Sequence, residues 1–184
     1  MVLPTADSAI SAPPDPADAA AALLAQLRDA HASLALAMRV LEELTCGSLA
    51  DRERYAAARW RISQASLSRR TLWGKIYRHL IAGVGLQDAA VLNDLQADEM
   101  RMLHCSAAHV GRWTMAAIDQ DWPGYCRASE VVRGQLSART DNERRLLYPM
   151  LERLSRARGN GPPRPAANVP THSWADRITA TRTR

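Results

Sequence analysis

Four long stretches of helix-forming residues, separated by short glycine- or proline-containing segments, constrain the fold of this chain more than any other feature. Within them no strand-like alternation of apolar and polar residues competes with the helical pattern. Helices of about 30 residues joined by short loops must lie antiparallel to their neighbours. The sequence therefore predicts an all-α, up-down-up-down four-helix bundle over residues 17–155. Its expected helices cover about 17–46, 49–82, 86–119 and the region from Asp121-Trp122-Pro123 to just before Gly159.

The two ends of the chain differ in composition from the expected bundle. Residues 1–16 contain four prolines, and residues 156–184 are rich in Pro, Arg and Thr. Such segments bury too little apolar surface to offset the entropy of ordering. We expect a disordered lead over 1–16 and a flexible tail over 156–184.

The net charge of +5 is a property of this tail and not of the bundle. The tail holds six arginines and one acid, so residues 1–155 carry equal numbers of basic and acidic groups. A nucleic-acid partner is therefore not expected for the bundle, whereas the tail is a candidate for binding an anionic partner. The expected helices alternate in charge, which suits neighbours in one bundle. The basic second helix is a further candidate surface for an anionic partner.

Each expected helix has an apolar seam at helical spacing, interrupted by a few polar residues. The first seam contains His31, the second contains Arg69, and the fourth contains Arg139 and Glu143 one turn apart. In the third seam the polar members are Glu99 and His109. Counting residues back from each turn predicts one shared layer in the bundle, made of His31, Gln64, Met102, Arg139 and Glu143.

Two segments of the sequence resemble the hemerythrin-like (HHE) family of four-helix bundles. In the first helix the resemblance lies in Leu27-Arg28-Asp29-Ala30-His31, and in the last it lies in Glu143 followed by Leu147-Tyr148-Pro149. The family has a histidine four residues before this glutamate, where this chain has Arg139. A fainter likeness places Gln64 where the family has a second histidine.

The resemblance implies a di-iron or similar metal centre that binds oxygen, senses oxygen or nitric oxide, or stores iron. Such a centre needs several imidazoles and carboxylates converging from the helices. Here Arg139 is a permanent cation that can neutralise the Glu143 carboxylate in place of a metal. We therefore expect a buried polar network of His31, Gln64, Arg139 and Glu143 without a cofactor. A residual metal site of His31 and Glu143, with Glu99, and a small-ligand pocket beside His31 remain alternatives.

Other chemical motifs are weak. The three cysteines (46, 105 and 126) form no CxxC pair, and the neighbours His104, Cys105 and His109 point to different faces of a helix. No phosphate-binding glycine loop or nucleophile elbow occurs. Trp60, Trp73 and Trp113 are expected in the core, and Trp122 with Tyr125 is expected to clasp a hairpin.

These patterns predict a non-catalytic binding or regulatory protein. The first alternative is an iron-binding hemerythrin-like sensor or carrier. The second is an interaction module for an anionic partner, through the second helix or the tail. A protein partner is also compatible with the sequence. No apolar run is long enough to span a membrane, and the absence of a signal-like start predicts a cytoplasmic location.

Overall fold

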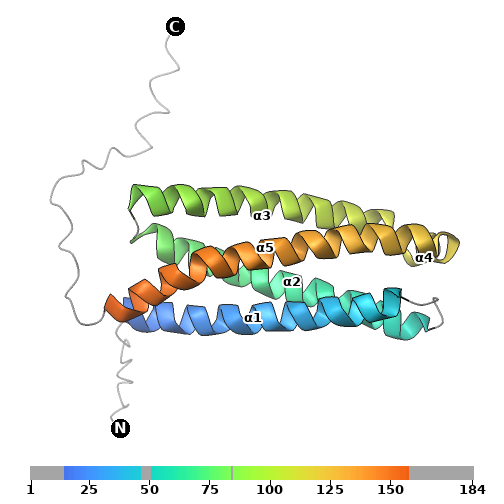
Figure 1. Cartoon of the computed structure of the whole chain (residues 1–184), viewed down its shortest axis with the longest axis horizontal. Coiled ribbons are helices and arrows are strands. Elements are labelled where there is room, and N and C mark those ends of the chain that lie inside the picture. The colour runs from blue at the N-terminus through green and yellow to red at the C-terminus, as the bar shows by residue number, and fades with distance from the viewer. Residues whose placement is uncertain (1–14, 47–50, 84, 158–184) are drawn as a thin grey trace, which may run out of the picture.

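The computed structural model describes residues 15–46, 51–83 and 85–157, and these form five helices. Four are long and pack side by side, each running opposite to the one before it (Figure 1). This confirms the prediction of an all-α bundle of four long helices. The helices are α1 (Pro16–Thr45), α2 (Arg52–Ile81), α3 (Leu86–Arg112), α4 (Met115–Gln120) and α5 (Trp122–Arg156).

Aspartate side chains cap three of the long helices at their N-termini. Asp15 Oδ1 accepts from the Ala17 amide at 2.9 Å, and Asp51 Oδ1 accepts from the Arg54 amide at 2.9 Å. Asp121 Oδ1 accepts from the Gly124 amide at 2.8 Å. Each carboxylate satisfies an amide that has no partner inside the helix, so these residues set where the helices begin.

The largest difference from the prediction lies between α3 and α5. The third helix was expected to continue to about residue 119, but it ends at Arg112. Trp113 has a non-helical backbone, with φ −101° and ψ 69°. Thr114 then caps the six-residue helix α4 by accepting from the Ala117 amide at 3.2 Å. The expected lead and tail lie outside the described residues, apart from residues 15–16 and 156–157, which belong to α1 and α5 and their caps.

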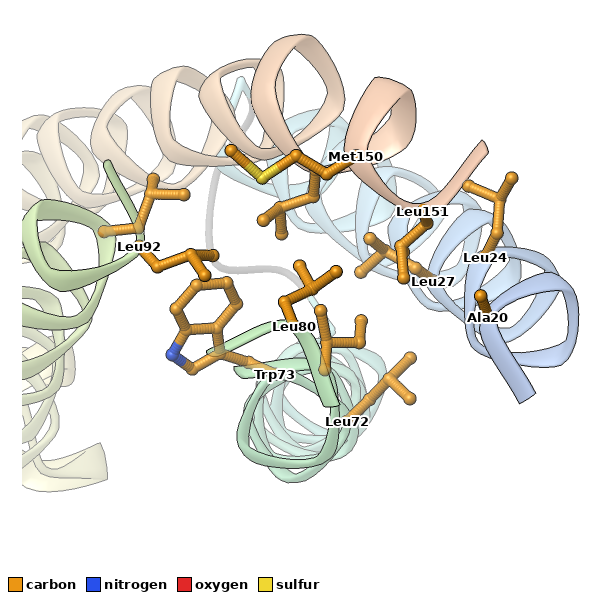
Figure 2. Close-up of a cluster of buried hydrophobic side chains, with 12 residues drawn as sticks. Ala20, Leu24, Leu27, Leu72, Trp73, Leu80, Leu92, Met150 and Leu151 are labelled. Carbon is orange, nitrogen blue, oxygen red and sulfur yellow. The ribbon is translucent and has the colours of Figure 1, made fainter. Parts of the chain in front are cut away.

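Two apolar cores occupy opposite ends of the bundle. At the end where α2 connects to α3, the core is mainly leucine, with Trp73 reaching toward Leu92 of α3 (Figure 2). At the end that contains α4, the core is mainly aromatic. The leucine core consists of Ala20, Leu24, Leu27, Leu72, Trp73, Ile76, Leu80, Leu92, Leu95, Leu147, Met150 and Leu151. The aromatic core consists of Leu41, Tyr55, Ala58, Trp113, Ile118 and Tyr125.

The four long helices are not packed equally. Helix α1 makes extensive contacts with α2 and with α5, whereas α3 makes far fewer with α5 and fewest with α2. Helices α2 and α3 are joined at one end and diverge toward the end that contains α4 (Figure 1). Among the described residues, no helix is both long and apolar enough to cross a membrane.

Candidate functional site

A layer of charged side chains separates the two apolar cores. We call it the ionic layer. Its central members are almost completely buried and come from all four long helices, because each lies on the apolar seam of its own helix. The layer consists of the buried His31, Arg69, Glu99, Arg139 and Glu143, with Arg70, Asp98 and Tyr148 at its edge.

Glu143 of α5 is the centre of the layer and is 0% exposed. Its Oε1 accepts from Arg69 Nη1 at 2.5 Å and from Arg139 Nε at 2.8 Å. Its Oε2 bonds to His31 Nε2 at 2.9 Å. Because a carboxylate only accepts, His31 carries the proton on Nε2.

Glu99 of α3 is the second carboxylate, and Arg69 bridges it to Glu143. Arg69 Nη2 donates to Glu99 Oε2 at 2.6 Å, and Arg70 Nε donates to Glu99 Oε1 at 3.1 Å. Arg69 of α2 therefore uses its two terminal nitrogens on two carboxylates from two other helices. This forked geometry is specific to a guanidinium group, and lysine would not reproduce it.

Arg139 of α5 completes the layer on the α3 side. Its Nη1 donates to the Leu95 carbonyl at 2.7 Å and to Asp98 Oδ2 at 2.9 Å. Its guanidinium carbon lies 5.5 Å from the centre of the Trp73 ring, a cation–π contact with the leucine core. Arg139 thereby ties α5 to α3, which has few other contacts.

The charges in the layer balance, with three arginines facing three acids. Burial alone would raise the pKa of Glu143, but the hydrogen bond from His31 and the charges of Arg69 and Arg139 outweigh burial and lower it. Burial likewise opposes the ionised form of Asp98, and its bond with Arg139 reverses the effect and lowers its pKa. The Glu143 charge raises the pKa of Arg139 against the opposing effect of burial. These pKa shifts all favour the ionised forms of Glu143, Asp98 and Arg139.

His31 connects Glu143 to a tyrosine at the edge of the layer. Its Nδ1 lies 2.9 Å from the Tyr148 hydroxyl, and the two rings stack at 5.7 Å. The Arg28 guanidinium lies over the ring of this tyrosine, 5.4 Å from the ring centre, and forms an ion pair with Glu152. The imidazole is thus held by one bond at each nitrogen.

Sequence reasoning placed three of these residues together, and the structure brings the same three into contact. They are His31, Arg139 and Glu143. Gln64, the expected fourth member, is exposed on α2, and its place in the layer is taken by Arg69. The prediction of Gln64 as a buried network residue is wrong because the depth count was in error by more than one helical turn. On α3 the layer residue is Glu99, not Met102.

A metal ion does not fit the donor set of the ionic layer. All four carboxylate oxygens of Glu99 and Glu143 already accept hydrogen bonds, and three of them accept only from guanidinium nitrogens. Both residues are buried from solvent. Glu143 Oε2, the fourth, bonds to His31. Across the described ranges, no group of three or more His, Cys, Asp or Glu side chains is arranged to hold a metal ion.

The other residues considered from the sequence lie away from the layer. His104 and Cys105 are exposed on α3, and His109 is half-buried. Trp73 and Trp113 are buried as expected, but Trp60 is 66% exposed, so its placement in the core is wrong. The expected clasp is confirmed by ring contacts that join Tyr125 to Trp122, Trp113 and Tyr55.

The chain matches no protein-family model, no curated protein and no solved structure. Its structure is an all-helical bundle of long helices, and no family is identified for it. The likeness to hemerythrin-like proteins consequently remains a hypothesis that rests on the residues quoted for it.

Proposed function

We propose that this chain is a non-catalytic binding or regulatory protein, built like a hemerythrin-like bundle, in which guanidinium groups stand where metal ions would. The observation that carries the proposal is the bridging of Glu99 and Glu143 by Arg69. In a di-metal bundle, carboxylates from facing helices bridge the metal ions. Here a side chain bridges the carboxylates instead.

Charge supports this proposal over the alternative of an iron-binding sensor. A guanidinium group stays protonated at every physiological pH, so it cannot give way to a cation by losing its proton. A metal ion would have to displace Arg69 or Arg139 and leave that charge buried without a partner. A buried unpaired charge costs several kcal/mol.

The burial of the acid–base pair from solvent supports a non-catalytic role. His31 and Glu143 are the pair best suited to acid–base chemistry, yet they are 1% and 0% exposed. Each is bonded to the other, and their remaining bonds go to Tyr148, Arg69 and Arg139. A general acid or base must reach the proton that it transfers, and this pair faces other protein groups.

Metal analysis of the purified full-length chain tests the proposal. We expect iron and zinc well below one ion per chain, both as purified without added metal and after anaerobic iron loading. The loaded protein should show no near-ultraviolet band from a ligand-to-iron transition. A stoichiometric metal that is lost in the His31→Ala variant would overturn the proposal and favour the iron-sensor alternative.

Two substitutions sharpen this test by asking what keeps metal out. Arg139→His alone restores the residue found in the resembling family, but Arg69 still occupies both glutamates, so we expect no metal binding. Adding Arg69→Ala frees the carboxylates, and the double variant should then bind zinc, measured by competition with a chromogenic chelator. Zinc binding by the single variant would show that Arg69 is not the obstacle.

The second helix favours a second candidate function, binding to an anionic macromolecule. Arg61, Lys75 and Arg78 of α2 have no carboxylate within ion-pair distance among the described residues. Binding to duplex DNA and to acidic vesicles should be measured at two salt concentrations, with and without residues 156–184. Loss on truncation would assign such binding to the tail, and binding that survives truncation but falls with salt would assign it to α2.

A further inference from the structure

A cavity of about 300 Å³ lies between α2, α3 and α5, on the side of the ionic layer nearest α4. It exists because α3 diverges from α2 over this half of the bundle (Figure 1). The volume is at the lower end of the range for small-molecule sites. Its lining includes the buried Leu41 of α1, Tyr125 and Ser129, so the cavity reaches the interior of the bundle.

The wall of this cavity is mainly apolar, and its polar groups carry positive charge or none. The apolar side chains include Leu41, Ile62, Leu103, Val132 and Leu136. Serines line it from all three flanking helices, and not one of its lining residues is an aspartate or a glutamate. An apolar body therefore fits the interior, and a negative charge has no repelling neighbour in the wall.

Two half-buried arginines at the cavity have no carboxylate partner within the described part of the chain. Among the described residues, the Arg59 guanidinium of α2 donates to Met115 Sδ at 3.9 Å and lies over the Tyr125 ring, whose centre is 5.8 Å from its guanidinium carbon. Arg133 of α5 donates from Nη1 to Ser129 Oγ at 2.8 Å. Each guanidinium therefore has several donors without an acceptor among the described protein groups.

Both arginines act on the same part of the cavity. Burial lowers the pKa of His109, which also lines the cavity, and the charges of Arg59 and Arg133 lower it further. Arg59 and His109 also both contact the Tyr125 ring, with 5.8 Å from the Arg59 guanidinium carbon and 5.7 Å from the His109 ring centre to the centre of the tyrosine ring. A third lining arginine, Arg70, differs from them because Glu99 neutralises it.

We propose that the cavity binds an amphipathic monocarboxylate, whose apolar chain lies on the leucine wall and whose carboxylate is held by Arg59 and Arg133. A carboxylate is planar and accepts paired bonds from guanidinium groups, so it would use donors that are otherwise idle. Binding of this ligand class rests on the proposed non-catalytic binding function and gives it a ligand. A polyanion fits the cavity less well than a monocarboxylate, because beyond the arginines the wall is mainly apolar and offers further charges few partners.

Calorimetric titration of the full chain with octanoate tests the assignment, with 1-octanol and acetate as matched probes. Octanol has the same chain length without the charge, and acetate has the charge without the chain. We expect octanoate to bind at least about tenfold more tightly than either probe, since a charge-assisted bond is worth a factor of this size. Equal binding of octanoate and octanol, or no octanoate binding, would overturn the proposal.

Variants locate the site. Arg59→Gln with Arg133→Gln should weaken octanoate binding by about tenfold or more. The control is Arg54→Gln with Arg127→Gln, which removes two exposed arginines from the same helices and should leave binding unchanged. Ser106→Leu on α3 fills the cavity without altering charge and should also abolish binding. Equal loss in the control pair would contradict the assignment.

The titration is distinguishable from the test of the proposed function because it is done with a metal chelator present. A metal in the ionic layer would overturn the metal-free proposal without changing octanoate binding. Conversely, failure of octanoate to bind would remove this ligand class and leave the metal analysis as it stands.

Discussion

Two groups of arginines lie next to each other in this bundle and differ in what surrounds them. In the ionic layer, Arg69 and Arg139 are almost fully buried and face two glutamates. In the cavity, Arg59 and Arg133 are half-buried and face serine, methionine and tyrosine. Residue type is the same in both places, whereas the burial of the side chains and their acidic partners differ.

From this difference we infer that an arginine stabilises the fold where acidic side chains neutralise its charge. Where they do not, its guanidinium group is available to bind a ligand. In the layer, the paired charges hold α3 against a bundle that it otherwise contacts sparsely. In the cavity, the same charge is left for a ligand that brings its own carboxylate. We therefore expect that breaking the first pair's ion pairs destabilises the fold, and that removing the second pair has little effect on it.

Glu143→Gln should have the largest effect on stability. It leaves Arg69 and Arg139 with one carboxylate fewer and gives the buried layer a net positive charge. Removing one partner of a buried ion pair costs about 3–5 kcal/mol of unfolding free energy. Urea denaturation followed by circular dichroism measures this value.

Glu152→Gln is the matched control on the same helix. Its pairs with Arg28 and Arg156 are near the surface, so the change should stay below about 1 kcal/mol. Similar losses in the two variants would mean that the layer is no more important than a surface pair.

Lowering the pH should reduce the stability of the fold through the same ionic layer. The folded-state pKa of Glu143 and of Asp98 lies below the ordinary carboxyl value, so the unfolded chain binds more protons in acid. This stabilisation is fully present above the ordinary carboxyl pKa and is lost as the pH falls through the folded-state pKa. The urea midpoint should therefore decrease as the pH is lowered below the ordinary carboxyl range, and less steeply in Glu143→Gln. An equal slope in both proteins would assign the acid sensitivity to other groups.

Tyr148→Phe should have a smaller effect. It removes one hydrogen bond from His31 while keeping the stacked ring, so we expect a loss of about 1 kcal/mol. Tyr77→Phe breaks an exposed bond to Asn93 and should cost only a few tenths of a kcal/mol. If Tyr148→Phe lost as little stability as Tyr77→Phe, the hydrogen bond between His31 and Tyr148 would not be needed to hold His31 in place.

Arg133→Gln should have the smallest effect, within about 0.5 kcal/mol of the native protein, because no carboxylate loses its partner. Arg139→Gln is the same type of change six residues further along α5, and it should instead cost several kcal/mol. Thermal unfolding of the two variants in parallel checks the contrast. A large loss in Arg133→Gln would show that its charge has a structural partner.

Much of the fold could be predicted because helix-forming residues and Asp caps specify it locally. Asp121 with Pro123 marks the start of α5 in the sequence as it does in the structure. The end of α3 was missed although Gly111 lies in its last turn, because a single glycine inside a helical pattern does not by itself end a helix.

The candidate site was predictable only in part for a related reason. His31 and Glu143 stand out as polar residues on apolar seams, and so do Arg69 and Glu99. Choosing the partners by counting from the loops introduced an error, because connection lengths shift the register between helices. A search for ionisable residues on the four apolar seams would have found every buried member of the ionic layer. Trp60 shows the converse, since its apolar type suggested burial at a position that lies off the seam.

A double-mutant cycle between Arg69 and Glu143 tests most directly whether the arginines of the layer are held by its carboxylates. The unfolding free energies of Arg69→Met, Glu143→Gln and the double variant should be measured together with that of the native protein. The double variant leaves Arg70 and Arg139 facing Asp98 and Glu99, which restores charge balance. We predict that it is more stable than the sum of the single losses by about 2 kcal/mol. Additive losses would contradict the account, because they would show that the two charges do not stabilise each other.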